Sequence, residues 1–522
     1  MGIKAEYGCS SVAGSCESIV ALLGKERVGL IRADIFKIIR NFGIEHFNFH
    51  YTGLDGRIRS LKLPFSDMKT AERLLALGER ADGSSLFRGL VDASVSDIYI
   101  VPRYDSVFLN PFNSKSLDFM CRFVDRDGEL SKFTHDGILA RTEAQLQNES
   151  GCELWAMGEL EFYLVYPRPE PYDLYPAQTQ GGYHISEPFF KYENVVDEIL
   201  HIVQQVTGSL KYAHSEVGNI QGLRSQNPVL AGCNAEQYEL EFLPRPINEA
   251  AEALCLARWL IRAVAARHGL LAVFTPKLDE DAAGSGMHIH MELRRDGVNC
   301  MLNPDGSLSR EAMKLIGGVV RYAPSISAFG NTQASSFLRL VPNHEAPTKI
   351  CWSYSNRSSL VRVPLGWTNV GDLGRLVNPQ EIMPFENSLT RQTVELRSPD
   401  GSANPYLLLA AIATAVKWGV THDEALEIAE RCHVKGNIFA DPELASTLDS
   451  LPGSCWECAQ LLQEKRALYE EDGCFPTFLI DYIIEALKKE DDAELHTYLG
   501  SLTGEAKLLA TLEVLQRDLH RN

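Results

Sequence analysis

The sequence has no long hydrophobic run and no recognisable targeting signal. Its most apolar stretch, YLLLAAIATAV, ends at Lys417, so it is too short to cross a membrane and predicts a buried helix. The run SIVALLG at residues 18–24 is too short and too closely flanked by charge for a signal peptide, and MGIKAE lacks the hydroxyl residue of a myristoylation site. We therefore expect a cytoplasmic protein with no membrane partner.

A disulfide framework and the common phosphate-binding loops are also missing. The twelve cysteines are scattered without regular spacing, which is typical of reduced thiols in a cytosol. Cys455 and Cys458 form one C-x-x-C inside a helical pattern, which favours ordinary buried cysteines over a zinc or redox site. There is no G-x-x-x-x-G-K and no complete G-x-G-x-x-G, so any bound phosphate is held in another way.

Positive charge is scarce. The chain has 50 Lys and Arg against 69 Asp and Glu, a formal net charge of −19. This balance argues against a nucleic-acid or anionic-membrane partner, although a solvated acidic surface is the commoner explanation of such a charge. The 522 residues, 45% of them hydrophobic, are enough for a sizeable core and predict more than one domain.

The stretch AGSGMHIHM, residues 283–291, carries the first chemical signal. Its second half alternates, so on a strand His288 and His290 would face one cavity while Met287 and Ile289 pack behind them. The Gly-Ser-Gly segment would let the backbone approach a ligand closely. A histidine pair on a strand is more often structural than metal-binding, so the context has to decide.

That context comes from three more charged pairs at the same spacing. Carboxylates in apolar strands are costly unless they are paired or bound to cations. Strands that bring Glu and His together predict a divalent-metal site, and a majority of carboxylates favours Mg²⁺ or Mn²⁺ over zinc. Arginines near the same strands imply a polyanion, most simply nucleotide phosphates. The pairs are Glu159 with Glu161, Glu239 with Glu241, and Glu395 with Arg397.

Seven motifs, in order along the chain, make the sequence resemble the glutamine synthetase family. They are ADGSS at 81–85, GELEF at 158–162, HSEV at 214–217, GSGMHIH at 284–290, RLVPNHEAP at 339–347, NRSSLVRVP at 356–364 and VELRSPDGSANPY at 394–406. The resemblance implies an α+β fold in which a small N-terminal β-grasp domain precedes a large glutamine-synthetase-type catalytic α+β domain.

Three segments are expected. Residues 1–32 show no clear element and would form a mobile extension, 33–128 the β-grasp domain, and 129–522 the catalytic domain. Helical spacing marks residues 33–43, 187–206 and 247–269, and residues 47–65 predict two strands around a Leu-Asp-Gly turn.

The resemblance also implies roles for individual residues. Glu161, Glu216 and Glu239 would hold one divalent cation, and Glu159, His288 and Glu395 a second. Arg357 and Arg362 would contact nucleotide phosphates, and His290 would lie beside ATP. Arg339 would take the α-carboxylate of glutamate, Arg397 would lie near its γ-carboxyl group, and the backbone at Gly284 near its amine. Asp82 and Ser85 of an adjacent subunit, with Glu345, would form an ammonium pocket.

The implied activity is an ATP-dependent glutamate–ammonia ligase of nitrogen metabolism that forms glutamine through γ-glutamyl phosphate. Ammonium is not nucleophilic, so an anionic pocket must bind it and then accept its proton. The family forms ring homo-oligomers, which implies a dodecamer of two hexameric rings whose sites are shared between subunits.

Several departures keep alternatives open. Ala283 stands where the family usually has Asn, the 22-residue link between Glu216 and Glu239 is longer than usual, and no adenylylation motif follows Tyr406. Lys211, Pro244 and Glu292 fall near positions of the adenine pocket and differ from the family. The alternatives are a γ-glutamyl ligase that uses an organic amine and a non-catalytic oligomer. Taken singly, Arg362 could form a surface salt bridge and Asp82-Gly83 a turn.

Overall fold

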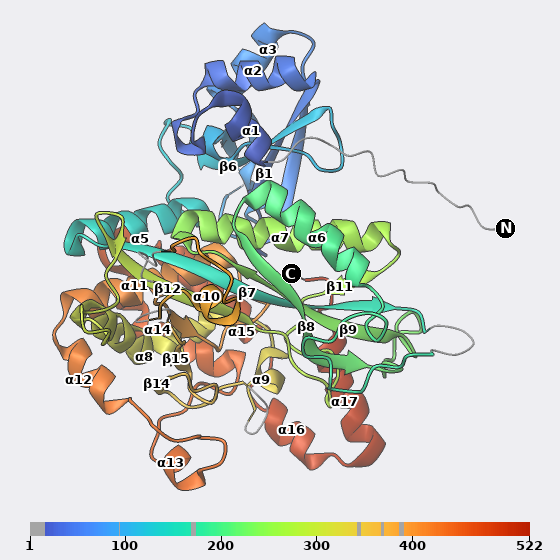
Figure 1. The fold of residues 1–522 in the computed structure, drawn as a ribbon, viewed down its shortest axis with the longest axis vertical. Helices are drawn as coiled ribbons and strands as arrows, with labels where there is room; N and C mark the ends of the chain where they lie inside the picture. Colours follow the sequence, from blue (N-terminus) through green and yellow to red (C-terminus); the bar gives the residue numbers. More distant parts are fainter. Residues whose placement is uncertain are drawn as a thin grey trace. The chain divides into compact units, whose positions relative to one another are not determined.

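The computed structural model of the chain describes residues 16–92, 94, 96–168, 174–341, 346–366, 370–385 and 391–521. These residues form two compact units (Figure 1). The first comprises the chain up to Gly53, Ile58–Ser131 and Glu198–Gly208, and the second comprises Leu54–Arg57, Lys132–Asp197 and Ser209 onward.

The first unit is built on a six-stranded sheet with strand order β2-β1-β6-β4-β3, in which β5 pairs with β6. Strands β1 and β2 form the antiparallel pair that the sequence predicted, and β1 runs parallel to β6. This mixed sheet with its helices is the expected β-grasp arrangement. The elements are β1 His46–Thr52, β2 Ile58–Pro64, β3 Glu79–Asp82, β4 Asp97–Pro102, β5 Phe108–Leu109, β6 Ser116–Val124, α2 Arg32–Phe42, α3 Met68–Leu77, α4 Gly83–Leu86 and η3 Tyr104–Ser106.

The expectation that residues 1–32 contain no element was wrong for the part that the structure describes. Helix α1 spans Cys16–Leu23 and the 3-10 turn η1 spans Arg27–Gly29. Ile19 is buried, and Arg27 Nη2 donates to the Val107 carbonyl at 2.9 Å. The helix is too short for its periodicity to stand out, and contacts with distant residues stabilise it. Residues 1–15 lie outside the described part of the chain.

The second unit holds a ten-stranded sheet with the order β14-β15-β16-β12-β7-β9-β8. Strands β10 and β11 pair with β7, and β13 pairs with β12. The long central strands are β7 Glu153–Tyr166, β8 Leu210–Ile220, β9 Asn234–Phe242 and β12 Met287–Arg295. The short ones are β10 Arg245–Pro246, β11 Leu271–Val273, β13 Val298–Asn299, β14 Trp352–Tyr354, β15 Val361–Val363 and β16 Val394–Leu396.

Helices pack against this sheet and against one another, so the α+β class is confirmed. The run ending before Lys417 forms the buried helix α11, Pro405–Thr421, and α7 spans Ile247–Arg267 as the sequence predicted. Helix α6, Glu193–Thr207, begins six residues later than its pattern. The remaining helices are α5 His135–Ser150, α8 Arg310–Gly330, α9 Ser336–Arg339, α10 Leu373–Val377, α12 Glu424–Arg431, α13 Pro442–Ser446, α14 Cys455–Glu470, η4 Glu471–Gly473, α15 Thr477–Lys488, α16 Leu495–Ser501 and α17 Gly504–Gln516. None of these described helices is both long and apolar enough to cross a membrane.

One face of β7 packs against helix α7, and the other face carries carboxylates. On one face Leu160 and Phe162 are fully buried, and a Cβ at Gly158 would come within 2.6 Å of Leu254 on α7. Glycine at this position therefore lets α7 pack close to the strand. Because side chains alternate along a strand, Glu159 and Glu161 point to the opposite face.

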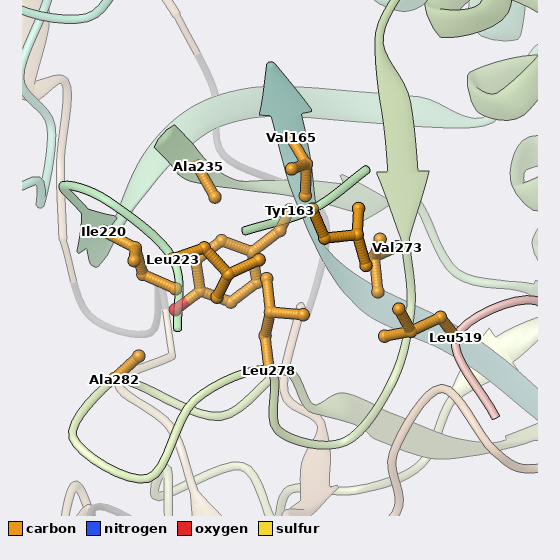
Figure 2. Packing of buried hydrophobic residues seen from close by; sticks show 10 residues of the cluster. Tyr163, Val165, Ile220, Leu223, Ala235, Val273, Leu278, Ala282 and Leu519 are labelled. Carbon is orange, nitrogen blue, oxygen red and sulfur yellow. The ribbon is translucent and has the colours of Figure 1, made fainter. Parts of the chain in front are cut away.

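A hydrophobic cluster fixes the end of β7 and the loop that leads to β12 (Figure 2). Tyr163 and Val165 of β7 pack with Leu278 of that loop and with Leu519 near the C-terminal end. The Tyr163 hydroxyl also donates to the Ala283 carbonyl at 2.8 Å. The cluster thus anchors the backbone just before the Gly-Ser-Gly segment.

Candidate active site

Five neighbouring strands of the second unit bring carboxylates and imidazoles together on one face. Pairing of β12 with β7 sets His288 opposite Glu159, and pairing of β7 with β9 sets Glu161 opposite Glu239. Three groups of side chains have ligand atoms within 4.8 Å of one another, close enough to hold a metal ion. They are Glu159 with His290 and Glu395, Glu159 with Glu239 and His288, and His214 with Glu216 and Glu239.

Both histidines of the H-x-H pair contact one carboxylate. His288 Nδ1 lies 2.8 Å from Glu159 Oε2, and His290 Nε2 lies 2.8 Å from Glu159 Oε1. The other ring nitrogen of His290 lies 3.0 Å from the Thr393 hydroxyl. The structure thus brings His290, which the resemblance assigned to the nucleotide, as close to the carboxylates as His288.

The electrostatics of the cluster show a shortage of positive charge. Burial, and then repulsion from neighbours that include Glu159 and Glu161, raise the pKa of Glu239 well above its usual range. Burial also opposes ionisation of Glu159, but His290 and His288 outweigh it and hold its pKa well below the usual range. A set of carboxylate oxygens with one or two imidazoles that lacks compensating charge fits a hard divalent cation such as Mg²⁺ or Mn²⁺.

Glu161 is oriented by the protein itself. Its Oε2 accepts hydrogen bonds from the Gly286 amide at 2.9 Å and from Gln237 Nε2 at 3.1 Å. The same Gln237 amide donates to the Gly284 carbonyl at 2.9 Å, and its oxygen accepts from the Gly218 amide. We did not single out Gln237 from the sequence, although it lies two residues before Glu239 and so shares its strand face.

Two arginines flank Glu395, which is almost completely buried. Arg362 Nη1 lies 2.8 Å from one carboxylate oxygen, and Arg397 Nε lies 3.1 Å from the other. Arg397 also donates to the carbonyl of Arg357. The side chain of Arg362 is only 21% exposed, so its ion pair with Glu395 is not a surface salt bridge.

Arg339 is packed against the glycine segment. Its Nη1 donates to the Ser398 carbonyl at 2.8 Å, and the residue is buried. A Cβ at Gly284 would lie 2.8 Å from the Arg339 side chain, and one at Gly286 would lie 2.7 Å from its Nη2. The Gly-Ser-Gly sequence is therefore required for a guanidinium to lie against this backbone.

These residues line two cavities that meet at the carboxylate cluster. A cavity of about 350 Å³ contains Arg339, Gly284 and Ala283 in its wall, and we call it the substrate cavity because the resemblance assigns Arg339 and Gly284 to glutamate. A cavity of about 660 Å³ contains Arg357, Arg362 and His290, and we call it the nucleotide cavity because the resemblance assigns these residues to ATP. Four side chains line both cavities: Glu161, Glu216, His288 and Arg397.

The departures from the family pattern fall in the walls of these cavities. The Ala283 amide donates to Gln180 Oε1 at 2.8 Å, so the backbone is held although the side chain is small. Lys211, Pro244 and Glu292 line the nucleotide cavity, and Lys211 Nζ lies 2.5 Å from Glu241. The long link after Glu216 continues β8 to Ile220, and Leu223 and Leu230 then join the hydrophobic cluster of Figure 2.

Two more residues of the nucleotide cavity had no assigned role in the sequence prediction. His214 Nε2 lies 2.9 Å from Glu239 Oε2, and Arg357 lies over the Tyr183 ring at 5.9 Å from its centre. His214 is the first residue of the HSEV motif and two residues before Glu216, so strand alternation could have found it. Tyr183 follows a loop and has no such signal.

In the first unit, Asp82 and Ser85 lie together at the start of α4. Asp82 accepts hydrogen bonds from the Ser84 hydroxyl at 2.7 Å and the Ser85 hydroxyl at 2.6 Å, and these bonds lower its pKa to about 2. Asp82 is thus an exposed anion at neutral pH. Glu345, the third member of the expected ammonium pocket, lies outside the described residues.

The C-x-x-C pair belongs to another part of the second unit. Cys455 and Cys458 are buried at the start of α14, and the Cys455 amide donates to Asp492 at 2.7 Å. Burial raises the pKa of both thiols well above the usual range.

The chain is similar to several known proteins. Residues 137–501 match the family model described as glutamine synthetase, catalytic domain. Glutamine synthetase of Thermus thermophilus is 28% identical over 401 residues, which cover 75% of this chain and 81% of that protein. The cryoEM structure of Plasmodium falciparum glutamine synthetase superimposes with a TM-score of 0.70 at 18% identity and covers 91% of this chain and 98% of its own. A structure titled as a GmaS/ADP complex gives 0.66 at 21% identity, with 90% and 96% covered. The chain therefore belongs to the glutamine synthetase family and is a glutamine synthetase-like ligase.

Proposed function

We propose that the protein is a glutamate–ammonia ligase that uses ATP to form glutamine through γ-glutamyl phosphate. One observation carries this proposal: the substrate and nucleotide cavities meet at Glu161, Glu216, His288 and Arg397. An acyl phosphate can form only where a carboxylate and the terminal phosphate of ATP come together. This junction is the place in the described chain where carboxylate ligands and arginines surround such a meeting point.

In the substrate cavity, the Arg339 guanidinium takes the α-carboxylate of glutamate, and the backbone at Gly284 faces its amine. Arg339 is always charged and its planar group suits a carboxylate. Its contacts with the Ser398 carbonyl and with both glycines fix its orientation. Glutamate bound in this way directs its γ-carboxylate toward Arg397 and the cluster.

In the nucleotide cavity, Arg357 and Arg362 bind the phosphates and His290 lies beside them. Glu161, Glu216 and Glu239 would hold one divalent cation and Glu159, His288 and Glu395 another, with His214 and His290 close enough to take part. Bound Mg²⁺ or Mn²⁺ supplies the charge that neutralises the phosphates and the incoming carboxylate.

The chemistry then takes two steps. A γ-carboxylate oxygen attacks the terminal phosphorus, the bond to ADP breaks, and γ-glutamyl phosphate forms. Arg357 and Arg362 stabilise the charge that moves onto the departing oxygens. Ammonia next attacks the acyl carbon, phosphate leaves, and the amide loses a proton to a nearby base.

Before this attack the bound ammonium must lose a proton, which requires an anionic pocket that binds the cation and accepts its proton, and we assign this pocket to Asp82, Ser85 and Glu345. The lowered pKa of Asp82 keeps it anionic, as binding of ammonium requires. We infer that Asp82 comes from an adjacent subunit of a ring homo-oligomer. Mixing an Asp82→Ala chain with a Glu345→Ala chain should then restore part of the activity, whereas mixed assemblies without recovery would mean that each site forms within one chain.

A γ-glutamyl ligase for an organic amine is the second candidate. The side chain of Ala283 is smaller than the Asn usual in the family and lines the substrate cavity, so it leaves room for a carbon substituent. The anionic Asp82 favours ammonium instead, because a small cation needs charge more than space.

Trapping of the acyl phosphate tests the proposal. The wild type with glutamate, ATP and Mg²⁺ should release γ-glutamyl hydroxamate when hydroxylamine replaces ammonium. Arg339→Gln should raise the KM for glutamate about 100-fold or more, because it removes a charged carboxylate partner. Arg310→Gln is the matched control, since Arg310 is an exposed arginine that pairs with Asp423. Absence of hydroxamate from wild type would overturn the proposed reaction.

A further inference from the structure

A third cavity lies beside the substrate cavity in the second unit. It has a volume of about 340 Å³, which is within the usual range for small-molecule sites. We call it the C-terminal cavity because helices α16 and α17 form much of its wall. Its lining residues are Lys277, Glu280 and Asp281 before the glycine segment, Leu338 and Val341 around α9, His496, Leu499 and Gly500 of α16, and Lys507, Thr511 and Leu515 of α17. Lys277 and Asp281 also line the substrate cavity.

Lys277 is the unusual member of this wall. The residue is only 4% exposed, yet no residue in the described part of the chain accepts a hydrogen bond from its ammonium group or lies in an ion pair with it. Burial lowers its pKa, although Glu280 and Asp281 oppose this effect from a distance. Its ammonium group borders both cavities without a direct partner in the described chain, so an anion bound in either cavity would compensate its charge.

Two more charged groups face the same cavity without a partner among the described residues. Lys507 lies one helical turn from Thr511 on α17, so both side chains point to the same side. Glu280 supplies the opposite charge, whereas the carboxylate of Asp281 is taken by Arg224 at 2.8 Å. The cavity therefore offers two cations and one anion for a ligand.

Besides His496 and Thr511, the wall contains four aliphatic side chains. Leu338, Val341, Leu499 and Leu515 come from three helices and one loop and surround the charged groups. A ligand that matches this wall has a carboxylate, a nearby ammonium group and an aliphatic side chain.

We propose that the C-terminal cavity is a binding site for an α-amino acid with an aliphatic side chain, separate from the site for glutamate. The carboxylate contacts Lys277 and Lys507, the ammonium group contacts Glu280, and the side chain packs on the leucines. Because Lys277 lines both cavities, the amino acid is in a position to change the charge that the substrate cavity presents.

Calorimetry with three probes of equal carbon skeleton tests the chemical class. L-leucine carries all three features, leucinamide lacks the carboxylate, and 4-methylpentanoate lacks the ammonium group. We expect saturable binding of L-leucine to the full-length protein and at least about 10-fold weaker binding of each of the other probes. Equal affinity for L-leucine and 4-methylpentanoate would mean that the cavity does not recognise the ammonium group and binds simple carboxylates. This result would contradict the proposal.

Two variants locate the binding. Lys507→Gln removes a charge of this cavity alone and should weaken L-leucine binding about 10-fold or more, whereas Lys465→Gln changes an exposed lysine of α14 and should leave it unaltered. Gly500→Leu adds a large side chain at a residue that lines the cavity, where a Cβ meets no atom within 4 Å. It should abolish binding without lowering the melting temperature.

The outcomes are distinct. Binding that Lys507→Gln and Gly500→Leu both leave unchanged would place L-leucine elsewhere and overturn the proposal, as would the absence of any saturable binding to wild type. Loss of hydroxamate formation would affect only the proposed function, since L-leucine binding needs neither ATP nor glutamate.

Discussion

Two clusters of buried charge, one in each unit, differ in what surrounds them. In the first unit, Asp118 is fully buried and accepts hydrogen bonds from Asn48 at 3.1 Å, Asn110 at 2.7 Å and the Ser116 hydroxyl, while His50 Nε2 lies 2.6 Å away. In the second unit, Glu239 faces other carboxylates, and burial together with their repulsion raises its pKa.

The difference separates a structural network from a candidate metal site. Protein donors compensate the Asp118 carboxylate completely, so this cluster needs no ligand and stabilises the fold. The carboxylates around Glu239 have too few donors and cations, so they gain stability when a cation binds. Removing one charge should therefore have opposite effects on stability at the two places.

The largest effect is expected on activity. Glu161→Gln keeps the shape of the side chain but removes a charge from the junction of the two cavities, and we expect ATP-dependent turnover to fall about 10³-fold or more. The variant should keep its fold, because the amide oxygen can still accept from Gly286. Steady-state kinetics with varied Mg²⁺ measures the loss. Turnover near the wild-type rate would mean that Glu161 is not a metal ligand.

Among the single charge removals, loss of the Asp118 charge should lower the free energy of unfolding most. Asp118→Ala leaves Asn48, His50 and Asn110 without their common acceptor, and we expect a loss of about 3 kcal/mol in the free energy of unfolding. Urea denaturation followed by circular dichroism measures it. Asp97→Ala, at an exposed carboxylate of the same unit, is the control and should cost little.

Two buried histidines extend the comparison to pH. Burial lowers the pKa of His135 to about 4, whereas Glu159 outweighs burial at His290 and raises its pKa. Below pH 6.5, His135 binds a proton in the unfolded chain but stays neutral in the folded protein. Its contribution to the free energy of unfolding is therefore fully present above pH 6.5 and falls by up to about 3 kcal/mol as the pH approaches 4. In His135→Gln this component should be absent. Parallel slopes for wild type and variant between pH 6.5 and 4 would contradict the lowered pKa.

Divalent cations should stabilise the second unit more modestly. At 100 times its dissociation constant, Mg²⁺ adds about 2.7 kcal/mol to the free energy of unfolding, and a chelator should reverse the gain. Glu239→Gln should weaken this response while stabilising the metal-free protein by about 1 kcal/mol, because it relieves repulsion. Thermal melts with and without Mg²⁺ test both signs. Destabilisation of the metal-free variant would mean that donors of the protein compensate the Glu239 carboxylate, as they compensate Asp118.

The sequence predicted the α+β class, which the structure confirms, whereas the roles of the site residues stay predictions. Alternation along a strand places Glu159 and Glu161 on one face, and this depends only on local geometry. Alternation also places His214 with Glu216 and Gln237 with Glu239, but the pairing of β7 with both β9 and β12, which brings these faces together, depends on contacts between distant segments. Helix α1 was missed for the same reason, because long-range packing stabilises it rather than its own periodicity.

The central claim is that ammonium is the amine that this ligase joins to glutamate. It is tested most directly by the ratio of kcat/KM for ammonium and methylamine, measured with glutamate, ATP and Mg²⁺ fixed at saturating concentrations. We expect a clear preference for ammonium in the wild type and its loss in Asp82→Asn, whose rate with ammonium should partly recover as rising pH supplies free ammonia. A wild-type preference for methylamine or a larger primary amine would contradict the assignment and establish the ligase as one for organic amines.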